Sequence, residues 1–141
     1  MIPRVVLDTN VLVAGLRSRL GACHRLLRLV GAGRFRPVLS VPLLFEYEEV
    51  LRRRSTGLRL AIGEVDAVVD YLCATGDHQP IHFLWRPRLP DPRDDLVLEV
   101  AVNGQCDTIV TFNGRDFVGS ERFGIAAITP AAFLTRLGAT R

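Results

Sequence analysis

The stretch VVLDTNVLV, residues 5–13, decides the fold of this chain. Its first three residues are apolar and end at Asp8, a pattern typical of a short strand buried on both faces of a parallel sheet. We expect a helix to begin at Asn10, with residues 11–16 supplying its apolar side. A buried strand that leads directly into a helix is the first unit of an α/β sheet.

The rest of the chain repeats this alternation. Gly57 is expected to break one helix, and Asn113-Gly114 to form a turn. The sequence therefore predicts a single α/β domain over residues 1–141, with a central parallel sheet flanked by helices on both faces. Further helices are predicted over residues 22–30, 42–53, 63–74, 94–102 and 131–137, and further strands over residues 37–41, 81–85, 107–111 and 125–128.

Length and hydropathy set the class of protein. The chain has 141 residues, of which 48% are hydrophobic, so it can bury a core and is not intrinsically disordered. No apolar run approaches the roughly 18 residues that a membrane span needs, so no membrane association is expected. The N-terminus enters a strand pattern at once and has no secretory signal, so the expected compartment is the cytoplasm.

The basic residues exclude several chemistries. All 18 are arginines, and the chain has no lysine. A Schiff-base enzyme and a P-loop nucleotidase both need a lysine and are therefore not expected. The three cysteines, Cys23, Cys73 and Cys106, are widely spaced, which argues against a disulfide framework or a zinc site.

Charge is distributed unevenly along the chain. Residues 1–60 hold 11 arginines and 4 acids, whereas residues 61–141 hold 7 arginines and 11 acids. A basic surface beside an acidic cluster suits a protein that holds a polyanion against a bound metal. Arginines that solvate amphipathic helices would give the same distribution.

Acidic and amide side chains follow the predicted strands, either directly or in the next loop or the first turns of the next helix. Ligands bind beyond the carboxyl ends of the strands in an open α/β sheet, and none of these positions needs a charge for folding. Carboxylates gathered there raise one another's pKa unless a cation neutralises them, and Mg²⁺ or Mn²⁺ is the natural partner. Such a cation can activate water for attack on a phosphodiester. In chain order the residues are Asp8, Glu46, Asp91, Asp94, Asp95, Asn113 and Asp116.

Each acid also has an ordinary structural interpretation. Asp8 belongs to a segment that could simply cap a helix, and Glu46 could be a solvated helix residue. Asp94 and Asp95 could form an N-cap with a partner for the helix dipole. Only the joint arrangement favours a site.

Five segments, in order and over essentially the whole chain, resemble the PIN-domain family. The likeness lies with its VapC-like branch, described as toxins of toxin–antitoxin pairs. The chain departs from the family pattern at Asn113, where many PIN domains have an aspartate; Asp116 could supply the missing charge. The segments are DTNVLV (8–13), FEY (45–47), DPRDDLVLEVA (91–101), DTIVTFN (107–113) and PAAFL (130–134).

The resemblance implies a metal-dependent endoribonuclease that uses Mg²⁺ or Mn²⁺, is usually a homodimer and is neutralised by a cognate antitoxin. It implies catalytic or metal-binding roles for Asp8, Glu46 and one of Asp94 and Asp95, with Asp94 favoured because it places Ala101 in the small position of the following helix. Two residues are candidates to complete the site: Asn113 as a metal ligand, or Asp116 as a ligand and catalytic carboxylate. Hydrogen bonds that orient Asp8 are expected from Thr9, Asn10 and Thr111.

Contacts with RNA are less sharply indicated. Arg17, Arg19 and Arg25 follow the first motif and are candidates to bind RNA phosphates. The run Arg52–Arg54 could bind RNA, or it could complement the negative end of a helix dipole. Trp85 and Phe112 could stack on bases, although core packing is the commoner role of an aromatic residue.

Two other functions fit part of the pattern. An aspartate phosphoacceptor domain also places an aspartate after its first strand, but it normally needs a lysine, and the phosphatase form needs a second aspartate where Asn10 stands. A degenerate PIN domain that binds RNA or a protein partner without cleaving would account for Asn113. Such a domain would bind Mn²⁺ poorly.

Overall fold

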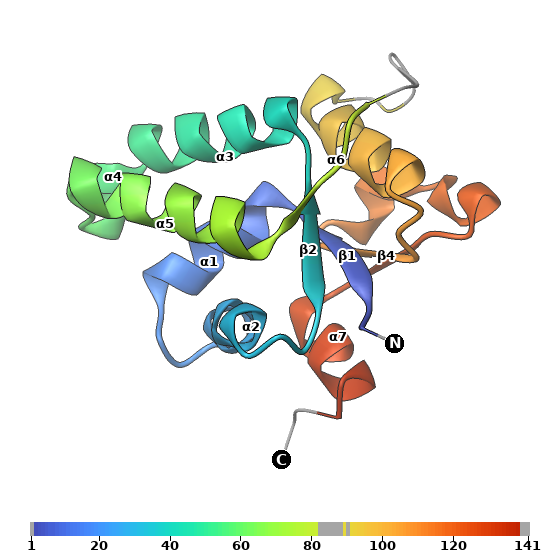
Figure 1. Ribbon diagram of the computed structural model, residues 1–141, viewed down its shortest axis with the longest axis horizontal. Helices are drawn as coiled ribbons and strands as arrows, with labels where there is room; N and C mark the ends of the chain where they lie inside the picture. The colour runs from blue at the N-terminus through green and yellow to red at the C-terminus, as the bar shows by residue number, and fades with distance from the viewer. Residues whose placement is uncertain (1, 82–88, 90, 139–141) are drawn as a thin grey trace.

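The computed structural model describes residues 2–81, 89 and 91–138. Strands and helices alternate along the chain, and Figure 1 shows how they are arranged. The strands are β1 (Arg4–Leu7), β2 (Arg36–Leu39), β3 (Asp77–His78), β4 (Thr108–Val110) and β5 (Ala126–Ile128). The α-helices are α1 (Thr9–Arg17), α2 (Ala22–Gly31), α3 (Val41–Arg53), α4 (Ser55–Leu58), α5 (Ile62–Thr75), α6 (Pro92–Asn103) and α7 (Pro130–Arg136), and two short 3₁₀ helices are η1 (Gly114–Phe117) and η2 (Ser120–Phe123).

The described strands form one parallel sheet in the order β3-β2-β1-β4-β5. In register, Val5 of β1 lies beside Pro37 of β2 and Thr108 of β4. Since all five strands run in the same direction, their carboxyl ends meet at one edge of the sheet. The predicted fold class, a parallel α/β domain, is confirmed.

Helices cover both sides of the central strands. In Figure 1, α1, α2 and α5 lie to one side of β2 and β1, and α6 lies to the other. Val5, Val6 and Leu7 of β1 are accordingly at most 1% exposed, as expected for a strand buried on both faces. In the part of the chain that the structure describes, no helix is both long and apolar enough to cross a membrane.

The crossing of α1 and α2 explains a glycine inside the first helix. A Cβ atom at Gly15 would lie 2.7 Å from Leu27 Cδ1 and 3.2 Å from the backbone of Cys23. The missing side chain therefore lets the two helices pack closely. This packing orients α1, whose first turn begins at the end of β1.

The caps of α1 and α6 lie upstream of the residues at which the sequence places the starts of these helices. The residue that caps α1 is Asp8 rather than Asn10, because the Asp8 carboxylate accepts a hydrogen bond from the backbone N–H of Thr9. The cap of α6 is Asp91, whose carboxylate accepts from the backbone N–H of Arg93. Asp94 therefore lies inside the first turn of α6 instead of opening the helix.

The predicted edge strand over residues 81–85 is wrong where the structure describes it, since Ile81 is not in a strand, and residues 82–85 lie outside the described part. The edge position is taken by β3, which pairs with β2. Asp77 of β3 forms ion pairs with Arg4 and Arg36, and these attach the short strand to its neighbours.

Two predicted breaks are also displaced. Gly57 does not end the long helix, because α3 already stops at Arg53 and Gly57 lies within the one-turn helix α4. The turn expected at Asn113-Gly114 continues as η1, which brings Asp116 back toward the carboxyl edge of the sheet.

Candidate active site

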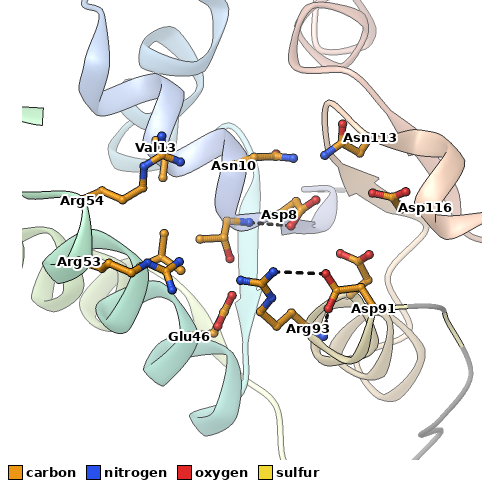
Figure 2. A pocket seen from close by; sticks show the side chains of 13 residues that line it. Asp8, Asn10, Val13, Glu46, Arg53, Arg54, Asp91, Arg93, Asn113 and Asp116 are labelled. Carbon is orange, nitrogen blue, oxygen red and sulfur yellow. Dashed lines mark hydrogen bonds and ion pairs between the residues drawn. The ribbon is translucent and has the colours of Figure 1, made fainter. Parts of the chain in front are cut away.

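A cleft of about 220 Å³ lies at the carboxyl edge of the sheet, as expected for this fold. Figure 2 shows side chains from α1, α3, α6 and the segment after β4 pointing into it. Five carboxyl groups and three guanidinium groups line the cleft. Its lining residues are Asp8, Thr9, Asn10, Val13, Glu46, Val50, Arg53, Arg54, Asp91, Arg93, Asp94, Asn113 and Asp116.

Asp8 is the most firmly held of the acids. Its Oδ1 accepts from the backbone N–H of Thr9 at 2.8 Å, and its Oδ2 accepts from Thr111 Oγ1 at 2.7 Å. Thr111 Oγ1 in turn accepts from the backbone N–H of Asn113 at 3.0 Å. The Asp8 carboxyl is buried, and burial raises its pKa, while the two hydrogen bonds act in the opposite direction.

Glu46 reaches the cleft from α3. The next residue, Tyr47, is buried, and its hydroxyl donates to the backbone carbonyl of Leu7 at 2.5 Å. Because Leu7 immediately precedes Asp8, this bond attaches α3 to the strand end that carries the first acid. Burial raises the pKa of Glu46, while nearby Arg93 acts in the opposite direction.

The structure separates Asp94 from Asp95. Asp94 points into the cleft, where burial and the charges of Asp8, Asp91 and Asp116 raise its pKa to about 7. Asp95 is fully buried and does not line the cleft; its Oδ1 accepts from the backbone N–H of Leu89 at 3.0 Å. Asp95 therefore holds the segment before α6. Of the two alternatives that the sequence left open, Asp94 is the one that faces the cleft, and its role in the site stays a prediction.

Asn113 and Asp116 both line the cleft. They come from the end of β4 and from η1, so the two alternatives for this corner are present together. The Asp116 carboxylate raises the pKa of Asp8 and of Asp94, which shows that its charge acts on the same cluster.

Of the two sets of arginines that the sequence offered for RNA contact, only members of the run Arg52–Arg54 reach the cleft. Arg53, Arg54 and Arg93 line it, whereas Arg17, Arg19 and Arg25 do not. Arg93 lies between Asp91, with Nη2 3.5 Å from the Asp91 carboxylate, and Glu46 (Figure 2). The Asp91-Pro92-Arg93 spacing was the available signal, since an N-cap and the residue two positions later share the first turn of a helix.

The other candidates for binding RNA lie elsewhere. Arg52 pairs with Asp66 of α5 at 2.7 Å, so it holds α3 against α5 instead of facing the cleft. Arg17 and Phe112 line a separate groove. Trp85 lies outside the described residues.

The donor set fits a hard divalent cation. Five carboxyl groups and two amides face one cleft, and burial together with nearby carboxylates raises the pKa values of Asp8, Glu46 and Asp94. A hard divalent cation would neutralise such a cluster. Asn10 Oδ1 is buried and accepts no hydrogen bond from the described residues. No three acidic, histidine or cysteine side chains of the described part converge closely enough to hold an ion as they stand, so binding would draw them together.

Comparison with known proteins adds one finding. The family model described as PIN domain matches residues 4–115, well over half of the chain. The match includes Asp8, Glu46 and Asp94 and ends one residue before Asp116. No curated protein matches the chain.

Proposed function

We propose that this chain, which belongs to the PIN-domain family, is a divalent-metal-dependent endoribonuclease that hydrolyses RNA phosphodiesters. PIN domains are generally nucleases and typically use divalent metals. The observation that carries the proposal is the meeting of Asp8, Glu46 and Asp94, from three separate elements, in one cleft with raised pKa values.

The cation would be Mg²⁺ or Mn²⁺, held by Asp8, Glu46 and Asp94 together with Asn113 or Asp116. When bound, it would neutralise the acids and supply Lewis-acid chemistry to water and to the phosphodiester. Asn10 Oδ1 is a further oxygen without a partner among the described residues at the same place.

The chain's own residues supply orientation and charge. Thr9 and Thr111 fix both oxygens of Asp8, so the central carboxylate does not need to be ordered when substrate arrives. Arg53, Arg54 and Arg93 stand at the cleft and would hold the phosphates that flank the scissile bond, where an acidic cleft alone would repel them. In the hydrolysis, water forms a bond to phosphorus, the bond from phosphorus to the leaving ribose oxygen breaks, and that oxygen takes up a proton.

The experiment is cleavage of a mixed pool of structured RNAs by wild-type protein and by Asp8→Asn, each with Mn²⁺ and with EDTA. The expected result is cleavage that needs Mn²⁺ and falls at least 100-fold in Asp8→Asn. Asp70→Asn, which changes an exposed carboxylate on α5, is the matched control and should cleave like wild type. Equal cleavage by wild type and Asp8→Asn would contradict the proposal and indicate a contaminating ribonuclease.

We further propose that the protein is the toxin of a toxin–antitoxin pair. It is supported by the likeness of the five motif segments to VapC-like toxins, and it includes a cognate antitoxin and a homodimer as partners. Induced expression in a bacterial host should arrest growth, and Asp8→Asn should not. Normal growth during expression of folded wild-type protein would contradict the toxin role while leaving the nuclease role intact.

The second candidate function is a degenerate PIN domain that binds without cleaving. Asn113 in place of an aspartate and the spread of the acids, with no three of the described ones converged, favour it. Calorimetric titration separates the two, because a degenerate site should bind Mn²⁺ no more tightly than Asp8→Asn does.

A further inference from the structure

An apolar groove of about 520 Å³ lies beside the acidic cleft. Helix α1 runs past both: Asn10 and Val13 line the cleft, and Ala14 and Arg17 line the groove. The segment after β4 does the same, since Phe112 lines the groove and its neighbour Asn113 lines the cleft. The groove therefore lies next to the cleft in which the scissile phosphate is proposed to lie, although the two share no lining residue.

Phe112 is the distinctive residue of this groove. It is 51% exposed, whereas Phe35, Phe117 and Phe133 are at most 2% exposed and form the core. The fold therefore does not need the Phe112 ring for burial. The neighbouring Thr111 Oγ1 binds both the Asp8 carboxylate and the backbone N–H of Asn113, and this holds the backbone beside Phe112 against the site.

The groove also carries a positive charge without a partner among the described residues. Arg17 lies at the end of α1, and its guanidinium makes no hydrogen bond or ion pair with another described residue. Most of the other lining residues have small side chains, among them Gly21, Ala22 and Ala131. A half-exposed ring, a guanidinium that no described residue pairs with and an apolar lining of small side chains together match a nucleobase and the phosphate attached to it.

We propose that this groove binds the unstacked base of a nucleotide next to the scissile phosphate, with the base on Phe112 and the neighbouring phosphate on Arg17, and that it thereby selects single-stranded RNA. The proposal rests on the proposed nuclease function. RNA is the occupant that fits because the groove adjoins the acidic cleft along α1 and the segment after β4, and because Arg17 complements a phosphate. A segment of a protein partner would favour the same apolar surface, but it would not account for the position of Arg17 beside Phe112 at the margin of the acidic cleft.

The test combines a variant with an altered substrate. Cleavage by wild type and by Phe112→Ala is measured on a single-stranded oligoribonucleotide with one mapped cleavage site, and on copies that carry one abasic nucleotide beside that site. Stacking on an aromatic side chain is worth about 1–3 kcal/mol per base, so kcat/KM should fall by about 5- to 150-fold in Phe112→Ala. The abasic substitution should lower kcat/KM for wild type by a similar factor and cause little further loss in Phe112→Ala.

Controls distinguish stacking from a general defect. Phe112→Tyr should keep wild-type cleavage, because it retains the ring. Phe123→Ala, which removes an exposed ring in η2 on a different surface, should cleave both oligonucleotides as wild type does. Arg17→Gln should weaken binding and reduce its dependence on salt.

Each outcome is decisive. Wild-type rates for Phe112→Ala on both oligonucleotides overturn the groove proposal but leave the nuclease standing, and loss of a protein partner by that variant would then assign the groove to protein. If wild type cleaves no RNA, base stacking is measured without cleavage. Single-stranded oligoribonucleotides that carry one fluorescent 2-aminopurine base are titrated with wild type and with Phe112→Ala, and quenching of the fluorescence reports stacking on the ring. Quenching that depends on Phe112 supports the groove while the nuclease fails, and no quenching overturns both.

Discussion

Asp94 and Asp95 show how much one residue of helical rotation changes. Consecutive side chains on a helix diverge by about 100°, so neighbours in sequence face different surroundings. Asp94 enters the cleft among other carboxylates, whereas Asp95 is buried and accepts a hydrogen bond from the Leu89 backbone. Asp94 is therefore the candidate for the site, whereas Asp95 supports the fold.

Substitution of these two acids should have opposite effects. Asp94→Asn should lower Mn²⁺ affinity by tenfold or more, because it removes a proposed ligand, and should keep or increase stability. Asp95→Ala should lower the free energy of unfolding by about 1–3 kcal/mol, because it removes a buried hydrogen-bond acceptor. Calorimetric titration with Mn²⁺ and urea unfolding of both variants test this. Loss of Mn²⁺ binding confined to folded Asp95→Ala would contradict the assignment of Asp94.

At the scale of elements, the site depends on how α3 is attached to β1. Glu46 is carried by a helix whose buried Tyr47 donates to the Leu7 carbonyl, immediately before Asp8. The hydrogen bond from Tyr47 to the end of β1 thus holds Glu46 of α3 close to Asp8. A helix that shifted by a fraction of a turn would carry Glu46 out of the cleft.

Tyr47→Phe tests that attachment. Loss of the hydrogen bond should lower the free energy of unfolding by about 1 kcal/mol and should weaken Mn²⁺ binding, because Glu46 is no longer held. The matched control is Tyr71→Phe, which removes a comparable bond, 2.7 Å from the Tyr71 hydroxyl to the Leu27 carbonyl, on a different surface. It should lose similar stability and keep its Mn²⁺ affinity. Equal Mn²⁺ affinity in both variants would show that Tyr47 does not position Glu46.

At the scale of the molecule, the parallel sheet brings several negative charges together at one edge, although their mutual repulsion opposes this arrangement. Five carboxyl groups meet at its carboxyl edge, and the pKa values of Asp8, Glu46 and Asp94 are raised as a result of burial and of mutual repulsion. Asp91 is the exception, because hydrogen bonds from Arg93 lower its pKa. The proposed cation binds where this repulsion is concentrated.

The stability of the metal-free protein should consequently depend on pH. The pKa of Asp94 rises from 3.8 to about 7 on folding, so between these values the folded state binds more protons than the unfolded state. Its contribution to stability is therefore present below about pH 4 and is lost as pH rises toward 7. In EDTA, Asp94→Asn should gain about 1–2 kcal/mol on wild type between pH 5 and pH 8, a discounted figure because solvent screens a partly exposed carboxyl.

Urea unfolding at the two pH values measures this difference. Mn²⁺ at 100 times its dissociation constant should restore about 2.7 kcal/mol to wild type at pH 8. Asp70→Asn should follow wild type throughout. Parallel pH profiles for wild type and Asp94→Asn would contradict the prediction.

Much of the fold could be predicted because its signals are local. The apolar run that ends at Asp8 identifies β1, and amphipathic spacing identifies α3 to within a residue. The two-residue strand β3 could not be found, because it is too short for a pattern and depends on pairing with β2 and on the ion pairs of Asp77. In the site, Asp8 and Glu46 follow from their places after strands, whereas the position of Arg93 depends on the cap at Asp91.

The sequence by itself determined the parallel α/β fold, the edge at which the acids collect and the residue types available there. These are properties of apolar periodicity and strand direction, which act over a few residues. The tertiary structure alone decided that Asp94 and not Asp95 enters the cleft, that Arg53, Arg54 and Arg93 face it instead of Arg17, Arg19 and Arg25, and that Phe112 stays exposed beside it. Those choices depend on helix rotation and on contacts between segments that are far apart in the chain, and no local pattern encodes them.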